Sequence, residues 1–115
     1  MSPSTAAAEL LHDEKLVRLL DDVVRTHHPL AVYVFGSRAE GRASPDSDYD
    51  LLVVLADDAT EADLDLDRAF ESGLRTRVAA DVIPTTRGLF LACRGNLSTI
   101  EGVAHARGLL LHGSV

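Results

Sequence analysis

Two short apolar runs constrain the fold of this chain most strongly. Leu30–Phe35 is almost entirely apolar and rich in β-branched and aromatic residues, and Tyr49–Leu55 is apolar except for Asp50. Runs of this length without a helical period are typical of strands that are covered on both faces. We therefore expect a buried strand at each run.

The sequence before these strands predicts one long helix. Residues 1–4 are expected to be disordered, and apolar residues then recur at helical spacing from Thr5 to about Thr26. Pro29 disfavours helical geometry at the residue before it, so the helix is expected to end near His27.

The sequence after the second strand predicts two helices, a third strand and two shorter elements. Thr60 and Asp63 resemble a capping box, which predicts a helix over roughly 61–72 that ends at Gly73. The expected elements that follow are a strand over Arg77–Ile83 closed by Pro84, a short helix over 86–92, a helix to about Arg107 capped by Asn96 or Ser98, and an edge strand over Leu109–His112. The order α-β-β-α-β-α predicts an α/β (α+β) fold with a small mixed sheet flanked by helices.

Length, charge and composition exclude several classes of protein. A chain of 115 residues is expected to form a single domain over residues 1–115. The net charge of −7 argues against a general electrostatic grip on nucleic acid. The sequence has no apolar run long enough to span a membrane, no signal-peptide pattern at its start and only one cysteine, Cys93. We therefore expect a cytoplasmic protein that binds neither membrane nor nucleic acid directly.

Two aspartates at the start of the second strand indicate a cation site. Asp48 and Asp50 are two positions apart, so both side chains project from the same face of a strand. Ionised carboxylates this close repel each other, and Mg²⁺ favours carboxylate ligands together with phosphate oxygens and water. Taken alone, the two residues would instead fit ordinary turn chemistry, in which Asp is common.

A Gly-Ser pair directly after the first strand indicates an anion site. Gly36 lets the backbone approach a ligand closely, and Ser37 can donate its hydroxyl to a phosphate oxygen. A helical turn over Ser37–Glu40 would add backbone N–H groups. Together with Asp48 and Asp50, this pair could hold a triphosphate against a cation.

Asp81 is a candidate third carboxylate. It lies among apolar residues in the third predicted strand, and it would meet Asp48 and Asp50 if that strand lay beside theirs. Three carboxylates could hold two metal ions, one at the acceptor oxygen and one at the nucleotide phosphates. The alternative is an edge-strand aspartate that faces water.

The spaced run G-S-R-A-x-G-x-A-x-x-x-S-D-x-D-L resembles the signature of the minimal nucleotidyltransferases of the DNA polymerase beta superfamily. The matching residues are Gly36-Ser37-Arg38-Ala39, Gly41, Ala43 and Ser47-Asp48-Tyr49-Asp50-Leu51. The resemblance covers nearly the whole chain and implies the polymerase-beta-like nucleotidyltransferase fold.

The resemblance also implies roles for these residues. Gly36, Ser37 and Arg38 would bind the nucleotide, although a structural salt bridge from Arg38 to a nearby aspartate is an equal alternative. Asp48, Asp50 and Asp81 would be the catalytic residues and would bind Mg²⁺, with two ions expected and ATP as substrate. Asp81 would help to deprotonate the acceptor hydroxyl.

The acceptor implied by the resemblance is a protein. Antibiotic-modifying relatives carry a second, helical domain that this sequence lacks, whereas stand-alone minimal nucleotidyltransferases are often paired with a HEPN-domain ribonuclease toxin. The expected function is that of an antitoxin that transfers AMP to a tyrosine of such a toxin. Two alternatives are a small-molecule nucleotidyltransferase, for example one that modifies an aminoglycoside with a partner subunit, and a binding module that neutralises its partner without catalysis.

Overall fold

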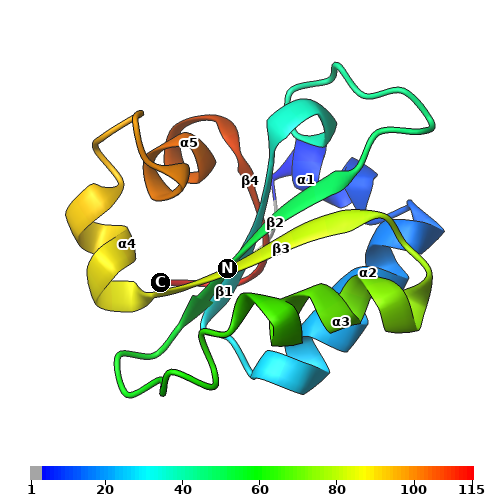
Figure 1. Cartoon of the computed structure of the whole chain (residues 1–115). Helices are drawn as coiled ribbons and strands as arrows, with labels where there is room; N and C mark the ends of the chain where they lie inside the picture. Colours follow the sequence, from blue (N-terminus) through cyan, green and yellow to red (C-terminus); the bar gives the residue numbers. More distant parts are fainter. Residues whose placement is uncertain (1–3) are drawn as a thin grey trace.

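Both apolar runs form the central strands of a four-stranded mixed sheet. The computed structural model describes residues 4–115, and its strands are β1 (Ala31–Phe35), β2 (Tyr49–Leu55), β3 (Ala80–Thr86) and β4 (Leu109–Gly113), in the order β3-β2-β1-β4 (Figure 1). β1 is antiparallel to β2 and β4, whereas β2 and β3 are parallel. β1 and β2 are nearly all apolar because helices cover both faces of the sheet at its centre.

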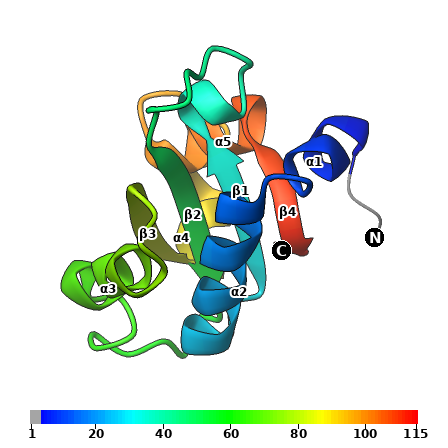
Figure 2. The same cartoon turned by 90° about the vertical axis from the view of Figure 1, so that its right-hand side faces the viewer.

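Helices α1 (Thr5–Leu10), α2 (Glu14–His27) and α3 (Leu66–Thr76) pack on one face of the sheet, and α4 (Arg87–Cys93) and α5 (Ile100–Arg107) pack on the other (Figure 2). The first face carries the larger core, in which buried residues of α2 meet alternate residues of β1 and β2. The smaller core joins Phe90 and Ala104 to Ala31, Leu52 and Val54. Within residues 4–115, no helix is long and apolar enough to cross a membrane.

The single helix expected over Thr5–Thr26 is wrong, because Asp13 divides it into α1 and α2. Asp13 has extended backbone geometry, and its Oδ1 accepts hydrogen bonds from the backbone N–H groups of Lys15 and Leu16 at 3.0 and 3.3 Å. An Asp in this role starts a new helix. The expected end near His27 is confirmed.

Ser4, the last of the four residues expected to be disordered, lies at the start of α1. Its hydroxyl accepts a hydrogen bond from the backbone N–H of Ala7 at 3.2 Å and caps the start of α1. Residues 1–3 lie outside the described residues.

The helix expected over 61–72 begins and ends later. Thr60 and Asp63 make the predicted pair of hydrogen bonds, but these close a separate turn before the helix. Asp65 is the N-cap of α3, which begins at Leu66. α3 also continues past Gly73 to Thr76, and Arg77, with φ 58, takes the left-handed C-cap conformation expected of the glycine. Gly73 instead packs tightly against the chain leading into β3. A Cβ at Gly73 would lie 2.9 Å from the carbonyl oxygen of Val78.

Two further boundaries differ from the sequence-based expectation. β3 spans Ala80–Thr86 rather than Arg77–Ile83, and it includes Pro84. A proline without an N–H is tolerated there because β3 is an edge strand. The cap of α5 is Thr99, whose hydroxyl accepts from the Gly102 N–H at 3.0 Å, and not Asn96 or Ser98. The short helix before it and the last edge strand are confirmed within a residue or so.

His27, the last residue of α2, has a buried imidazole whose two nitrogens have no hydrogen-bond partner. Burial, reinforced by the nearby charges of Arg68 and Arg75, lowers the pKa of His27 below its usual value. The unfolded chain therefore takes up this proton at a higher pH than the folded chain does, and folding stability falls as pH drops below about 6.5.

We predict that His27→Leu flattens this loss of stability between about pH 6.5 and 5, since a buried apolar side chain needs neither a proton nor a hydrogen-bond partner. Urea denaturation at several pH values measures the effect. The exposed His12→Leu is the control and should keep the wild-type slope. An equal slope in the His27→Leu protein and the wild type would show that this imidazole does not control acid stability.

Candidate active site

A single turn at the end of β1 brings the Gly-Ser pair against the start of β2. Residues Gly36–Arg38 form one turn of 3-10 helix, close to the turn expected at Ser37–Glu40. Gly36 has φ +72, and a Cβ added there would collide with Oδ2 of Asp50. The positive φ favours glycine at this position, and the missing Cβ leaves room for the Asp50 carboxylate. This contact places the backbone of Ser37 beside Asp50.

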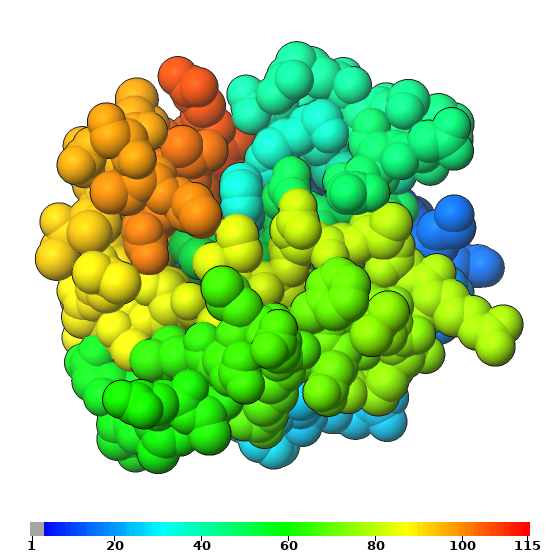
Figure 3. All heavy atoms as spheres, viewed as in Figure 1, coloured from blue at the N-terminus to red at the C-terminus, as the bar shows by residue number. Residues whose placement is uncertain are grey.

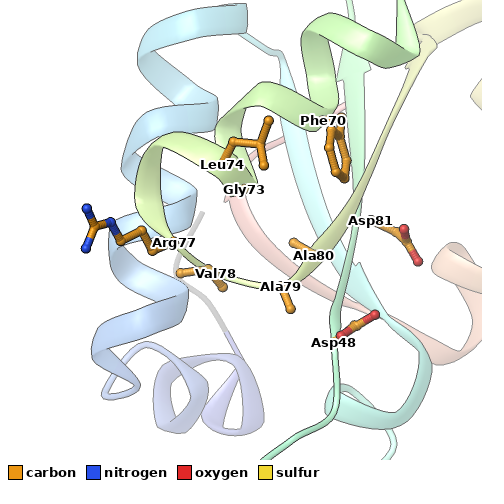
Figure 4. A pocket seen from close by; sticks show the side chains of 9 residues that line it. All are labelled: Asp48, Phe70, Gly73, Leu74, Arg77, Val78, Ala79, Ala80 and Asp81. Carbon is orange, nitrogen blue, oxygen red and sulfur yellow. The ribbon is translucent and has the colours of Figure 1, made fainter.

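The sheet register brings the third carboxylate to the same place. Asp50 lies opposite Phe35 of β1 on one side and opposite Asp81 of β3 on the other. Paired strands are only about 4.8 Å apart, so the Asp50 and Asp81 side chains are neighbours on one face. Asp48 precedes β2 by one residue, and its carboxylate points the same way as that of Asp81 (Figure 4). The structure thus brings all three predicted carboxylates together.

The position of these carboxylates follows from strand alternation. Asp50 shares its face of β2 with Leu52 and Val54, which α4 and α5 cover. Asp50 is the second residue of β2, so it lies at the end of that face, next to the loop that leads from the Gly36–Arg38 turn into β2. Asp81 is exposed, as the edge-strand alternative requires, and it also faces Asp50. The same face is therefore apolar at one end and acidic at the other.

The electrostatics of this cluster favour a cation. Burial, followed by the negative charges of Asp81 and Asp48, raises the pKa of Asp50. Among residues 4–115, no group of three or more acidic, histidine or cysteine side chains has the geometry of a metal site. The donor set nevertheless suits Mg²⁺, because carboxylates bind it together with phosphate oxygens and water. An ion held there would relieve the repulsion around Asp50.

Arg38 holds the loop before Asp48. Its guanidinium donates hydrogen bonds to the carbonyl oxygen of Ser47 at 2.7 and 3.2 Å and to that of Pro45 at 3.3 Å. It also lies 4.2 Å from the centre of the Tyr49 ring, a cation–π contact. The expected alternative, a salt bridge to an aspartate, is replaced by these backbone contacts. In this arrangement Arg38 supports the loop that leads into the carboxylates.

Tyr49 and Asp13 extend this support, and the sequence analysis missed both. The Tyr49 hydroxyl donates a hydrogen bond of 2.5 Å to the Asp13 carboxylate. Burial and this hydrogen bond raise the pKa of Tyr49 to about 12. Burial alone would raise the pKa of Asp13, but the Tyr49 and backbone hydrogen bonds hold it below its usual value. The sequence offers one indication of this contact, the aromatic residue Tyr49 between Asp48 and Asp50.

We predict that Gly36→Ala destabilises the fold by about 1–3 kcal/mol or more, since it strains the backbone and drives a methyl group into Asp50. Gly41→Ala is the matched control, because Gly41 also has φ +72 but has no atoms within 4 Å of an added Cβ. Urea denaturation compares the two variants. Equal destabilisation would contradict a specific contact between Gly36 and Asp50.

We also predict that Asp50→Asn raises the melting temperature at pH 7 in a chelating buffer. The raised pKa of Asp50 means that the folded state holds this proton more tightly than the unfolded state does, so ionisation near neutral pH costs stability. Millimolar Mg²⁺ should stabilise the wild type and not the variant. Asp46→Asn, which removes an exposed charge from the preceding loop, should keep the wild-type response. A wild type indifferent to Mg²⁺ would contradict the cation site.

Comparison with known proteins agrees with the fold and the site motif. Residues 14–84 match the family described as Polymerase beta, Nucleotidyltransferase. This segment includes β1, β2, α3 and nearly all of β3, and with them Gly36, Ser37 and the three aspartates. No curated protein matches the chain significantly.

Three solved toxin–antitoxin complexes are among the structures similar to this chain. A mutant form of the MntA-HpeT toxin–antitoxin complex has a TM-score of 0.53 at 19% identity, and a toxin–antitoxin complex with AMP-PNP has a TM-score of 0.51 at 20% identity. Each match covers 87% of this chain and 72% of the other. A tri-AMPylated HEPN toxin in complex with an MNT antitoxin, from Shewanella oneidensis, has a TM-score of 0.48 at 19% identity over 92% of this chain and 73% of the other. The match over residues 14–84 shows that the chain belongs to the polymerase beta nucleotidyltransferase family.

Proposed function

We propose that this protein transfers AMP from ATP to a tyrosine hydroxyl of a HEPN ribonuclease toxin and so acts as its antitoxin. The observation that carries the proposal is the convergence of Asp48, Asp50 and Asp81 beside the Gly36–Arg38 turn. This arrangement unites an acidic cluster that favours a cation with a backbone turn that can receive phosphate. Membership of a nucleotidyltransferase family agrees with this chemistry.

Each group has a part in the proposed reaction. Ser37 and the N–H groups of its turn would hold the phosphates, and Asp48 and Asp50, with Asp81, would hold Mg²⁺. When bound there, Mg²⁺ would supply charge neutralisation at the phosphates and a lower pKa of the acceptor hydroxyl. The tyrosine oxygen forms a bond to the α-phosphorus in line with the bond that breaks, pyrophosphate leaves, and Asp81 takes the tyrosine proton.

Two observations favour a protein acceptor in a toxin–antitoxin pair. The chain resembles the minimal nucleotidyltransferases, whose stand-alone members are often paired with HEPN toxins. Toxin–antitoxin complexes, one of them with AMP-PNP, also share its fold.

The test is transfer of label from ATP to the protein encoded by the adjacent reading frame. With Mg²⁺ present, label from [α-³²P]ATP should appear on that protein, and label from [γ-³²P]ATP should not, because pyrophosphate is the leaving group. Asp48→Asn, Asp50→Asn and Asp81→Asn should each lower the rate by about 100-fold or more. Asp46→Asn, the control of equal charge change, should act like the wild type.

Three results would contradict the proposal. Absence of label on the partner, with the wild type no better than Asp48→Ala, would exclude this activity toward that protein. Transfer of AMP to an aminoglycoside by this chain, with none to the partner, would favour the small-molecule alternative. A triple alanine variant of the three aspartates that still neutralised the partner would favour a binding module without catalysis.

A further inference from the structure

α3 presents a stripe of three large apolar side chains to solvent. Leu66, Phe70 and Leu74 are 61%, 54% and 63% exposed. They are four residues apart, so they form one line along the helix, which we call the α3 stripe. The buried side of α3, formed by Ala69, Ser72, Gly73 and Thr76, lies next to this stripe and leaves it exposed. A surface helix ordinarily turns a polar face to water, and a continuous apolar stripe indicates an interaction surface.

The α3 stripe is continuous with the candidate active site. Phe70 and Leu74 line a pocket of about 480 Å³ together with Asp48 and Asp81, and the Phe70 ring points toward β3 (Figure 4). Leu66 and Phe70 line a second pocket of about 330 Å³ that follows β3 and also includes Asp81. Figure 3 shows α3 in green alongside the yellow atoms of β3 on this face. The two pockets share Phe70 and Asp81, so a molecule on the stripe lies beside the carboxylates.

The charges around the α3 stripe are mainly acidic. Asp67 lines the second pocket beside Leu66, and Asp48 and Asp81 belong to the first. Two arginines of α3 are engaged elsewhere: Arg68 pairs with Asp63 at 3.0 Å, and Arg75 pairs with Asp22 at 2.8 Å. In Figure 4 the Arg77 side chain points away from the pocket. A partner that complements this surface would combine apolar side chains with basic ones.

We propose that the α3 stripe is the docking surface for the acceptor protein. The occupant is a segment with an apolar face and flanking Lys or Arg residues, and it brings the acceptor hydroxyl to Asp81. A second copy of this chain is a poor occupant, because two molecules with a net charge of −7 repel each other. This inference rests on the proposed function, because it assumes that the acceptor is a protein.

The test compares surface variants in transfer to the protein of the adjacent reading frame. Phe70→Ser and Leu74→Ser should raise the KM for that protein about tenfold or more, as expected for apolar anchors of an interface. The affinity for Mg²⁺ and a non-hydrolysable ATP analogue, and the melting temperature, should stay at the wild-type values because both side chains are more than half exposed.

Leu89→Ser and Leu97→Ser are matched controls. Leu89 lies in α4 and its side chain is 51% exposed, and Leu97 lies just before α5 and its side chain is 52% exposed. Both variants should keep the wild-type KM for the acceptor protein. If the stripe variants keep that KM while the wild type transfers AMP, docking on the stripe is overturned and the proposed function stands. An equal rise in KM in stripe variants and controls would also overturn it.

Direct binding separates failure of the docking surface from failure of the proposed function. If the wild type transfers no label, calorimetry measures the affinity of the wild type and of Phe70→Ser for the same partner, and so tests docking without catalysis. A tenfold or greater loss of affinity in Phe70→Ser supports docking on the stripe. Unchanged affinity, or no binding by the wild type, overturns it. Sedimentation velocity tests for a second copy of the chain on the stripe. If the wild type is a dimer and the Phe70→Ser variant is a monomer, a second copy occupies the stripe and the proposal is overturned.

Discussion

The architecture of the candidate site depends on the direct contact between the Asp50 carboxylate and the backbone of Gly36. There is no space for a Cβ between them, and the left-handed backbone of Gly36 turns the chain immediately after β1. This turn lets Ser37 and the N–H groups after it lie beside an acidic residue of the neighbouring strand. The turn and the carboxylate approach this closely because the residue between them is glycine, which has no Cβ and readily adopts a positive φ.

The sheet supplies the other constraint. Because β2 and β3 are parallel and paired in register, Asp81 lies next to Asp50, and its charge contributes to the raised pKa of Asp50. Two helical layers cover the central strands but leave this end of one face open. On the other face, the Tyr49 ring carries the Arg38 guanidinium and its hydroxyl binds Asp13. These contacts hold the start of β2 in place, and the pairing with β3 holds Asp81 beside it.

The sequence predicted the central strands, the mixed sheet and the shared face of Asp48 and Asp50, because these follow from apolar runs and from strand alternation. It placed Asp81 beside them only if its strand lay next to theirs, and the parallel pairing of β2 and β3 meets that condition. It did not predict the break at Asp13, since the helical spacing of apolar residues continues through that position and the Tyr49 contact is made across the fold. Nor could spacing show that α3 starts at Leu66 and turns apolar residues outward, because that depends on how the helix packs against β3.

The central claim is that these carboxylates and the Gly36–Arg38 turn form one nucleotide and cation site. A crystal structure of the protein with Mn²⁺ and a non-hydrolysable ATP analogue tests it most directly, because anomalous scattering locates the ion. We expect an ion bound by Asp48 and Asp50, with the triphosphate against Ser37. An ion or a nucleotide bound elsewhere on the protein, with this cluster empty, would show that these residues do not form the site.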